Sequence, residues 1–401
     1  MLFGLPWPVF ALSLATGLGM TLAVMSVTVT PSAGLQTAPE PWLASVPYGL
    51  QFCATMLAAY PLTALFATFG RKPVVLASVV LGVLAGIFSY LGVRSDSFLL
   101  LCLGTCSLGV FMAALASLRF AASELVPEDN RARALALTNF GGTFAAILGP
   151  SLAILAPSLL QMDFRQAVYL MMIVVVLVMS LLVLLTPFGT KPAPTPVQAQ
   201  SAAGDPQTAT SVLFVGTIFL FITFCGATSY GIMSGMMTAT GLEMEQVGIA
   251  DAPRTQLIQF HVLAMFGPSL VTGSILQRLG QRRFLTLGIV LLAAAPLTGL
   301  LAPAYWAFAA SLIFLGFGWN FLYVGGSAII AARFQGNDKF RSQGLYDTAA
   351  SLFSAVATLS AAMILAQLSW NGLMVAAIVM IAIMILFAVL SGFGERGSKT
   401  A

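Results

Sequence analysis

Soft metal-binding side chains recur at helical spacing in two neighbouring apolar segments of this 401-residue chain. His261 is the only histidine, and Met265 follows it by four residues, while Met233 and Met237 form a second pair with the same spacing. Side chains four residues apart lie on one face of an α-helix, about one turn apart. Thioether sulfur and neutral imidazole are ligands that select Cu(I) over hard cations. These four residues are therefore a candidate site for a soft metal ion.

Three cysteines provide further soft donors inside apolar segments. Cys225 lies eight residues before Met233, with Ser229 midway, and Cys102 and Cys106 form another four-residue pair. Thiols could receive a soft ion after the Met and His residues, so the three cysteines are secondary metal candidates. A small buried hydrophobe is the ordinary alternative role for each of them.

Other kinds of metal site are less favoured by these residue types. Ca²⁺ and Mg²⁺ require oxygen ligands, which are missing at the depth of the Met and His pairs. A closed four-ligand zinc site requires more histidine, cysteine or carboxylate than these segments contain. Each pair also has an ordinary alternative: a Met pair such as Met380 and Met384 is typical of flexible core packing, and a buried His261 can be a hydrogen-bonded packing residue.

The elements that position these residues are expected to be transmembrane helices. Hydrophobic residues make up 59% of the chain and charged residues only 7%, whereas soluble domains have roughly 25% charged residues. Apolar runs of about 20 residues, each long enough to cross the hydrocarbon core, recur along the chain. We predict twelve spans near residues 7–30, 42–66, 74–93, 97–118, 135–156, 167–187, 211–238, 254–277, 284–302, 305–331, 343–366 and 372–393.

The predicted fold is all-α and integral to the membrane, with twelve transmembrane helices in two six-helix, pseudo-symmetric halves. The N-terminal half covers residues 1–189 and the C-terminal half covers 211–401. A Pro-, Ala- and Gln-rich stretch over residues 190–210 is predicted to be a cytoplasmic linker.

The distribution of basic residues predicts that both termini are cytoplasmic. In that orientation fourteen of the seventeen Lys and Arg residues lie on the cytoplasmic side, as the positive-inside rule requires. The fourteen are Arg71, Lys72, Arg119, Arg131, Arg133, Lys191, Arg278, Arg282, Arg283, Arg333, Lys339, Arg341, Arg396 and Lys399. Only Arg94, Arg165 and Arg254 face the other side.

Charged groups are missing from the middle of the predicted spans. All thirteen acidic residues are expected in loops or at span edges, with Asp251 and Asp347 closest to entering the membrane. Intramembrane charges usually mark ion and proton pathways. Their absence argues against organic-anion carriers, carboxylate-driven proton symporters and exporters of cationic drugs. No catalytic, nucleotide-binding or nucleic-acid-binding motif is present, so we expect no enzyme, no prosthetic group and no nucleic-acid partner.

Two related loops connect this chain with a known family. TALFATFGRKP (Thr63–Pro73) and GSILQRLGQRR (Gly273–Arg283) both place a Gly before basic residues after the second span of a half. They resemble degraded copies of the major facilitator superfamily loop motif G-x-L-A-D-R-x-G-R-R, with Ala67 and Gln277 at its acidic position. Gly149-Pro150 is similar to part of the family's antiporter motif. The resemblance implies a cavity between two halves and alternating access.

The Met and His pairs give a narrower resemblance within that superfamily. MSGMM (Met233–Met237) with HVLAM (His261–Met265) resembles the M-x-x-x-M and H-x-x-x-M pair of CcoA-type bacterial copper importers. This resemblance implies that Met233, Met237, His261 and Met265 bind copper. It also implies import across the inner membrane to supply assembly of cbb3-type cytochrome oxidase. The expected partners are copper ion as the transported substrate, the lipid bilayer and a cytoplasmic copper acceptor.

Two alternatives stay open at this point. An exporter of neutral or hydrophobic organic molecules would use the Met- and Phe-rich walls as its binding surface. A membrane scaffold or sensor would bind copper without moving it. Protonation of His261 would remove one ligand, so we expect pH to influence the release of a bound ion.

Overall fold

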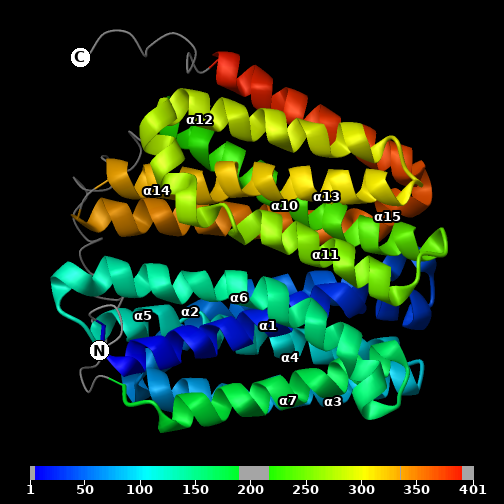
Figure 1. Cartoon of the computed structure of the whole chain (residues 1–401), viewed down its shortest axis with the longest axis horizontal. Coiled ribbons are helices and arrows are strands. Elements are labelled where there is room, and N and C mark those ends of the chain that lie inside the picture. The colour runs from blue at the N-terminus through cyan, green and yellow to red at the C-terminus, as the bar shows by residue number, and fades with distance from the viewer. Residues whose placement is uncertain (1–4, 189–215, 335, 391–401) are drawn as a thin grey trace. The chain divides into compact units, whose positions relative to one another are not determined.

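A computed structural model describes residues 5–188, 216–334 and 336–390 (Figure 1). The predicted linker over residues 190–210 lies outside the described residues, and so do both of its boundaries with the halves. The chain divides into two compact units, one of Met1–Pro196 with Gly248–Gln259 and one of Val197–Val247 with Phe260–Ala401. Each unit is described on its own below.

The first unit is built from long helices that pack against one another. Its main elements are α1 (Trp7–Thr37), η1 (Pro41–Leu43), α2 (Val46–Phe69), α3 (Arg71–Arg94), α4 (Phe98–Leu115), α5 (Leu118–Glu124), α6 (Glu128–Leu160) and α7 (Phe164–Leu185). Leu22, Phe111 and Tyr169 are fully buried in its core. The Tyr169 hydroxyl donates to Thr30 Oγ1 over 3.1 Å, so even this buried polar group is satisfied.

The second unit contains most of the candidate metal ligands. Its elements are α10 (Thr217–Gln246), the end of α11 (Asp251–Phe266), α12 (Ser269–Gly299), α13 (Tyr305–Trp319), the π-helical turn η3 (Asn320–Val324), α14 (Gly325–Arg333) and α15 (Gly336–Leu390). α10 packs along α15, and α12 packs along α13.

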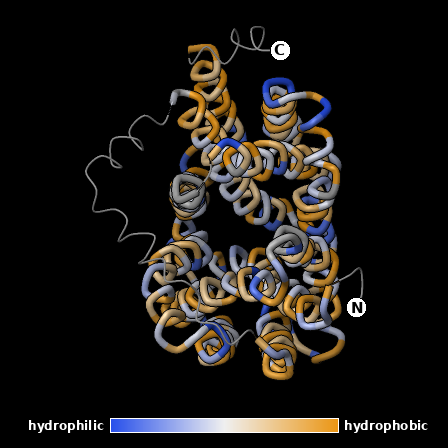
Figure 2. The backbone as a smooth tube through the Cα atoms, turned by 90° about the vertical axis from the view of Figure 1, so that its left-hand side faces the viewer, coloured by the Kyte–Doolittle hydropathy of each residue, from blue (hydrophilic) through white to orange (hydrophobic). Residues whose placement is uncertain are grey.

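The described residues contain twelve membrane crossings if two long helices are each divided at a break in the backbone. Among the described residues, ten helices are long and apolar enough to span a membrane. The backbone leaves the helical region at Gly280 in α12 and at Ser369 in α15, so each of these long helices is two segments. α11 and the start of α12 then form the eighth crossing, and the rest of α12 forms the ninth. The structure is all-α, as predicted, and its helices are apolar over most of their length (Figure 2).

The two related loops adopt the same backbone turn. Gly70 has φ +82° and Gly280 has φ +73°, values that favour glycine, and basic residues follow each of them. In the first loop the acidic position of the family motif is Ala67, but Arg71 Nη2 pairs instead with Glu124 Oε1 of α5 over 2.8 Å. The internal repeat therefore extends from sequence to local conformation, while the ion pair differs from the family motif.

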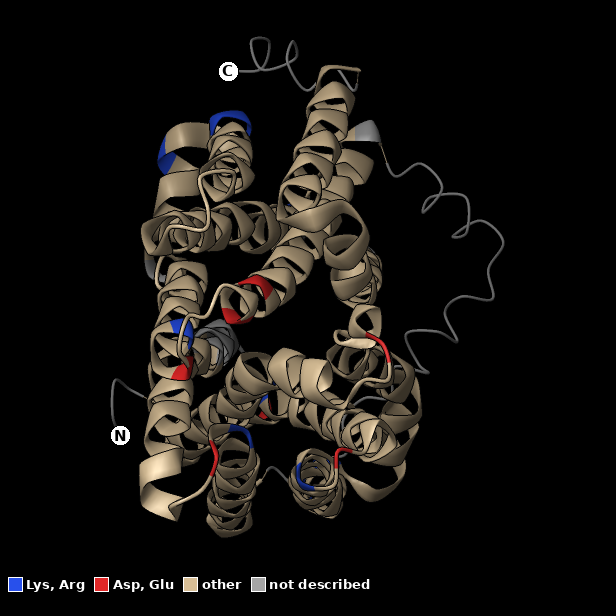
Figure 3. Ribbon diagram, turned by 90° about the vertical axis from the view of Figure 1, so that its right-hand side faces the viewer, with Lys and Arg blue, Asp and Glu red and all other residues tan. Residues whose placement is uncertain are grey.

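Several predicted boundaries were wrong. α10 ends at Gln246 rather than at residue 238, and the predicted span 254–277 is interrupted by Gly267 and Pro268. Pro268 has no amide hydrogen, which removes one helical hydrogen bond at this point. Asp347 lies in the first segment of α15, near the start of the predicted span 343–366, and accepts a hydrogen bond from Tyr323 Oη over 3.1 Å. Charged residues are otherwise sparse on the ribbon (Figure 3).

Candidate soft-metal site

Met233 and Met237 are buried on the face of α10 that meets α13. They are 3% and 7% exposed. Tyr230, one turn before Met233 and two turns before Met237, packs edge-on against Trp319 of α13, with ring centroids 5.6 Å apart. Residues three, four and seven apart share a helix face, so both thioethers lie on the side of α10 that faces α13.

His261 is fully buried, and only one of its two ring nitrogens has a hydrogen-bond partner. Nδ1 lies 2.7 Å from the carbonyl oxygen of Leu312 on α13. A carbonyl oxygen only accepts, so Nδ1 carries the proton and the neutral ring presents its lone pair at Nε2. Nε2 is buried and has no partner within the part of the chain that the structure describes. A fixed tautomer with an unused nitrogen is the usual arrangement of a metal-binding histidine.

Helix α13 is the common neighbour of both candidate pairs. A Cβ atom added at Gly316 would lie 2.7 Å from the carbonyl oxygen of His261 and 3.0 Å from the Met265 nitrogen. Trp319 packs against Phe266, next to Met265, with ring centroids 5.7 Å apart, and against Tyr230 on α10. The close approach that Gly316 allows therefore brings the backbone of the His261–Met265 turn against α13, on the stretch that also meets the Met233 face of α10.

The two pairs also match in depth. At 1.5 Å per residue, Met237 and Met233 lie about 14 and 20 Å from the end of α10 at Gln246. His261 and Met265 lie about 15 and 21 Å from the start of α11 at Asp251. The sequence placed both pairs within about two turns of the membrane surface. Because α10 extends to Gln246 and α11 begins at Asp251, both pairs lie farther than that from these two helix ends.

Cys225 does not share the helix face of Met233 and Met237. Cys225 is fully buried, but twelve residues of α-helix separate it from Met237 by about 18 Å along the axis and turn it by about 120°. Residues spaced by four, such as Cys225 and Ser229, therefore do not stay on the helix face of Met233 and Met237. Cys102 and Cys106 are partly buried on α4 of the first unit. A role for the three thiols as later acceptors stays a prediction.

Conventional metal ligands do not gather elsewhere in the described residues. No group of three or more His, Cys, Asp and Glu side chains suited to a metal ion is found in residues 5–188, 216–334 and 336–390. Methionine sulfur is the remaining kind of soft donor in these residues. The Met and His set supplies that sulfur together with one unpaired imidazole nitrogen.

Sequence reasoning missed the residues of α13 and η3 that support this set. Leu312, Gly316 and Trp319 lie along one face of the tenth crossing, followed by the buried Asn320 at the start of the π-helical turn. Asn320 has neither charge nor sulfur, so a pattern of ionisable and sulfur-containing residues does not indicate it. The Gly267-Pro268 interruption just after Met265 was a usable signal, since broken membrane helices often mark binding sites.

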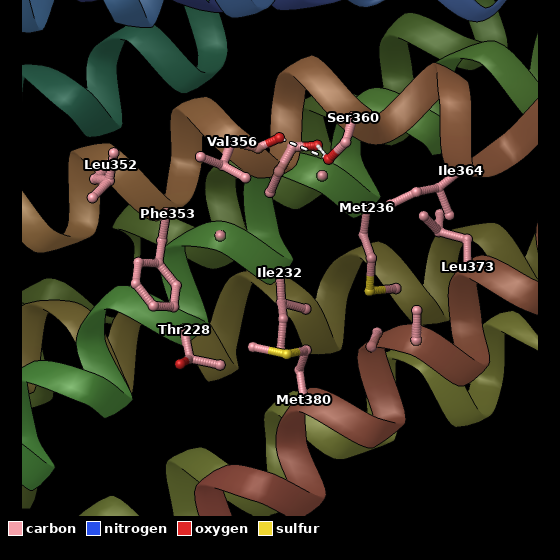
Figure 4. Close-up of a pocket in the computed structure, with 15 residues that line it drawn as sticks. Thr228, Ile232, Met236, Leu352, Phe353, Val356, Ser360, Ile364, Leu373 and Met380 are labelled. Carbon is pink, nitrogen blue, oxygen red and sulfur yellow. Dashed lines mark hydrogen bonds between the residues drawn. The ribbon is translucent and has the colours of Figure 1, made fainter.

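An apolar cavity of about 420 Å³ lies on the other side of α10, against both segments of α15 (Figure 4). Ile232 and Met236 line it from α10, Phe353 and Val356 from the first segment of α15, and Met380 from the second. Gly231 and Gly235 also belong to this face, and the adjacent Ser234 hydroxyl meets Ser354 over 2.6 Å. Met233 and Met237 do not line the cavity.

Comparison with known proteins identifies the family. The model of the Major Facilitator Superfamily matches residues 1–270 and 257–400. The riboflavin transporter RfnT of Brucella anthropi is 30% identical over 336 residues, which cover 84% of this chain and 83% of that protein. The uncharacterised MFS-type transporter YddS of Bacillus subtilis is 24% identical over 88% of this chain and 83% of its own length.

Solved structures with low sequence identity share the fold. An inward-facing bacterial homologue of the human lysosomal transporter Spinster matches with a TM-score of 0.72 at 15% identity, covering 96% of each chain. The D-xylose–proton symporter matches with a TM-score of 0.70 at 14% identity, covering 94% of this chain and 97% of its own. The chain is thus a multi-pass membrane protein and secondary transporter that belongs to the Major Facilitator Superfamily.

Proposed function

We propose that this transporter imports copper, as Cu(I), across the bacterial inner membrane. The supporting observation is the buried His261, whose Nδ1 is held by the Leu312 carbonyl while Nε2 has no partner in the described residues. Leaving a buried polar atom unpaired costs roughly 1–3 kcal/mol, so a ligand for that atom is expected. Met233, Met237 and Met265 supply thioether sulfur at matching depth.

The donor set suits a transported ion rather than a permanent one. Thioethers and a neutral imidazole are uncharged, so the empty site avoids the cost of burying ionised ligands. They are soft donors that favour Cu(I) over Ca²⁺, Mg²⁺ and Na⁺. Without a thiolate or carboxylate among the four residues, binding is expected to be modest, which allows the ion to leave.

Import requires that copper be taken up by an acceptor on the inner side. A cytoplasmic thiol acceptor would make inward transfer downhill without ATP, and Cys225, Cys102 and Cys106 are candidates to receive the ion on the way. With both termini cytoplasmic, as the basic residues predict, the C-terminal end of α10 faces outward. The imported copper would serve assembly of cbb3-type cytochrome oxidase.

A second candidate function is transport of a planar neutral molecule such as riboflavin. The 30% identity with RfnT favours it. Stacked rings of Trp319, Tyr323 and Tyr346, with centroids 5.1 and 5.4 Å apart, would suit an aromatic substrate. However, Tyr346 already donates to the carbonyl of Tyr323 over 2.7 Å, so part of this cluster has a structural role. Export of other hydrophobic molecules is the broader form of this candidate.

Uptake of radiolabelled copper and radiolabelled riboflavin into proteoliposomes separates these functions. We expect saturable copper uptake that His261→Leu abolishes and Met233→Ile reduces, and no riboflavin uptake above protein-free vesicles. Copper accumulation at the wild-type level in both variants would refute the proposal. Copper binding without saturable flux would identify a scaffold or sensor, and riboflavin flux insensitive to both substitutions would identify an organic-molecule carrier.

A further inference from the structure

Two helix irregularities meet beside the candidate ligand Met265. α11 ends at Phe266, and Gly267 and Pro268 separate it from α12. Opposite this break, the tenth crossing changes from α-helix to the π-helical turn at Asn320. Backbone groups at such breaks inside a membrane must find partners within the protein. π-Helical turns are also often found at functional sites.

The Asn320 side chain supplies one such partner. It is fully buried, and its Nδ2 donates to the carbonyl oxygen of Met265 over 2.6 Å and to Ser269 Oγ over 2.7 Å. Its Oδ1 accepts from Thr272 Oγ1 over 2.6 Å. One amide thus joins the last turn of α11 and the first turn of α12 to the tenth crossing.

We propose that Asn320 is a positioning residue, which sets the place of Met265 in the soft-metal site by holding its backbone carbonyl. This inference rests on the proposed function, because it assumes that Met265 binds the ion. Because Pro268 has no amide hydrogen to donate to the preceding turn, helical hydrogen bonds do not fully fix the last turn of α11. The hydrogen bond from Asn320 then fixes where the Met265 thioether lies relative to His261, one turn away.

Asn320 acts through Met265 rather than on the ion itself. Its oxygen already accepts a hydrogen bond from Thr272, and an amide oxygen is a hard donor that Cu(I) does not favour. Groups that orient metal ligands without touching the metal typically change its affinity by about 10–100-fold when they are removed. A purely structural role would instead lower the stability of the fold equally with and without the Met265 thioether.

A double-mutant cycle on the full-length protein separates the two roles. The measurement is the affinity for Ag(I), a soft monovalent ion without redox chemistry, by titration calorimetry, together with KM and maximal rate for copper uptake. Asn320→Leu removes all three hydrogen bonds and is combined with Met265→Leu. Thr272→Val is the matched control, because it removes the bond to Oδ1 and leaves the Met265 contact intact. Thermal unfolding of every variant checks that it is folded.

We expect Asn320→Leu to weaken Ag(I) binding by about tenfold and to raise KM in the wild-type background. In the Met265→Leu background it should have no further effect, and Thr272→Val should change the affinity by less than about twofold. Equal weakening in both backgrounds would overturn the inference while leaving the proposed function intact. If Met265→Leu alone leaves Ag(I) binding unchanged, the proposed ligand set fails as well. Should Asn320→Leu not fold, Asn320→Ser, which is too short to span the same contacts, takes its place in the cycle.

Discussion

The two faces of α10 have similar residues and different surroundings. One face presents Met233 and Met237 beside Tyr230, toward α13, the helix whose Leu312 carbonyl also holds the His261 ring. The other presents Ile232 and Met236 to the apolar cavity against α15. Both faces are apolar, and both contain methionine.

The difference shows that methionine has no fixed role by itself. Met236 and Met237 are neighbours in sequence, yet about 100° of helix rotation separates their side chains. Met236 shares its surroundings with aliphatic and aromatic carbon, so its thioether acts as flexible packing. Met237 lies at the depth of a buried imidazole. The partner across the helix interface decides which methionine is a candidate ligand.

Among these substitutions, replacement of His261 should have the largest effect on copper uptake. His261→Leu removes the only nitrogen donor, and we expect saturable copper uptake by proteoliposomes to be lost. The substitution also removes the hydrogen bond to the Leu312 carbonyl, which contributes roughly 0.5–1.5 kcal/mol of stability. His261→Gln is the control, because its amide can donate to that carbonyl but lacks a soft nitrogen. If His261→Gln transports copper like the wild type, the imidazole is not a ligand.

Met237→Leu should have the next largest effect, by weakening Ag(I) binding. Removal of one of four soft donors is expected to raise the Kd at least about tenfold, since even outer groups of metal sites contribute that much. Leucine has a similar volume and should pack in the same place at a cost below about 1.5 kcal/mol. Calorimetric titration with Ag(I) and a thermal unfolding curve measure both quantities. If Ag(I) affinity and thermal stability are both unchanged, Met237 is a packing residue like Met236 and not a ligand.

The sequence predicted the membrane fold better than the surroundings of the site. Apolar runs long enough to cross the bilayer core were sufficient to predict twelve crossings. The repeated loops, with a glycine before basic residues, were sufficient to predict two related sets. The interruption at Pro268 and the extension of α10 to Gln246 were missed, because hydropathy alone does not locate helix ends. The four-residue spacing correctly placed Met233 and Met237 on one face of a helix, and His261 and Met265 on one face of another. Which faces meet depends on long-range packing, such as the close approach at Gly316, and no local pattern encodes it.

A substitution at Gly231 should affect stability and leave metal affinity unchanged. A Cβ atom there would lie 3.2 Å from the carbonyl oxygen and 3.3 Å from the Cβ of Phe353 on α15. Gly231→Leu therefore forces α10 away from α15 and should cost about 1–3 kcal/mol, seen as a lower melting temperature. Gly241→Leu, on the same helix with no atom within 4 Å, is the matched control. A Kd for Ag(I) raised tenfold by Gly231→Leu would show that the two faces are coupled.

Met236→Leu should have the smallest effect of all, and this makes it the strictest test of the contrast between the faces. Its thioether lines a cavity whose other walls include Ile232, Phe353 and Met380, without a histidine or cysteine among the lining residues. A soft ion there would have at most two sulfur donors and no nitrogen, so we expect Ag(I) affinity and copper uptake within about twofold of wild type. Stability should change by less than about 1.5 kcal/mol, because the volume is conserved. If Met236→Leu weakened Ag(I) binding as much as Met237→Leu, sulfur content rather than the partnership with His261 would govern binding, and the ion would have to be sought on the α15 side of α10.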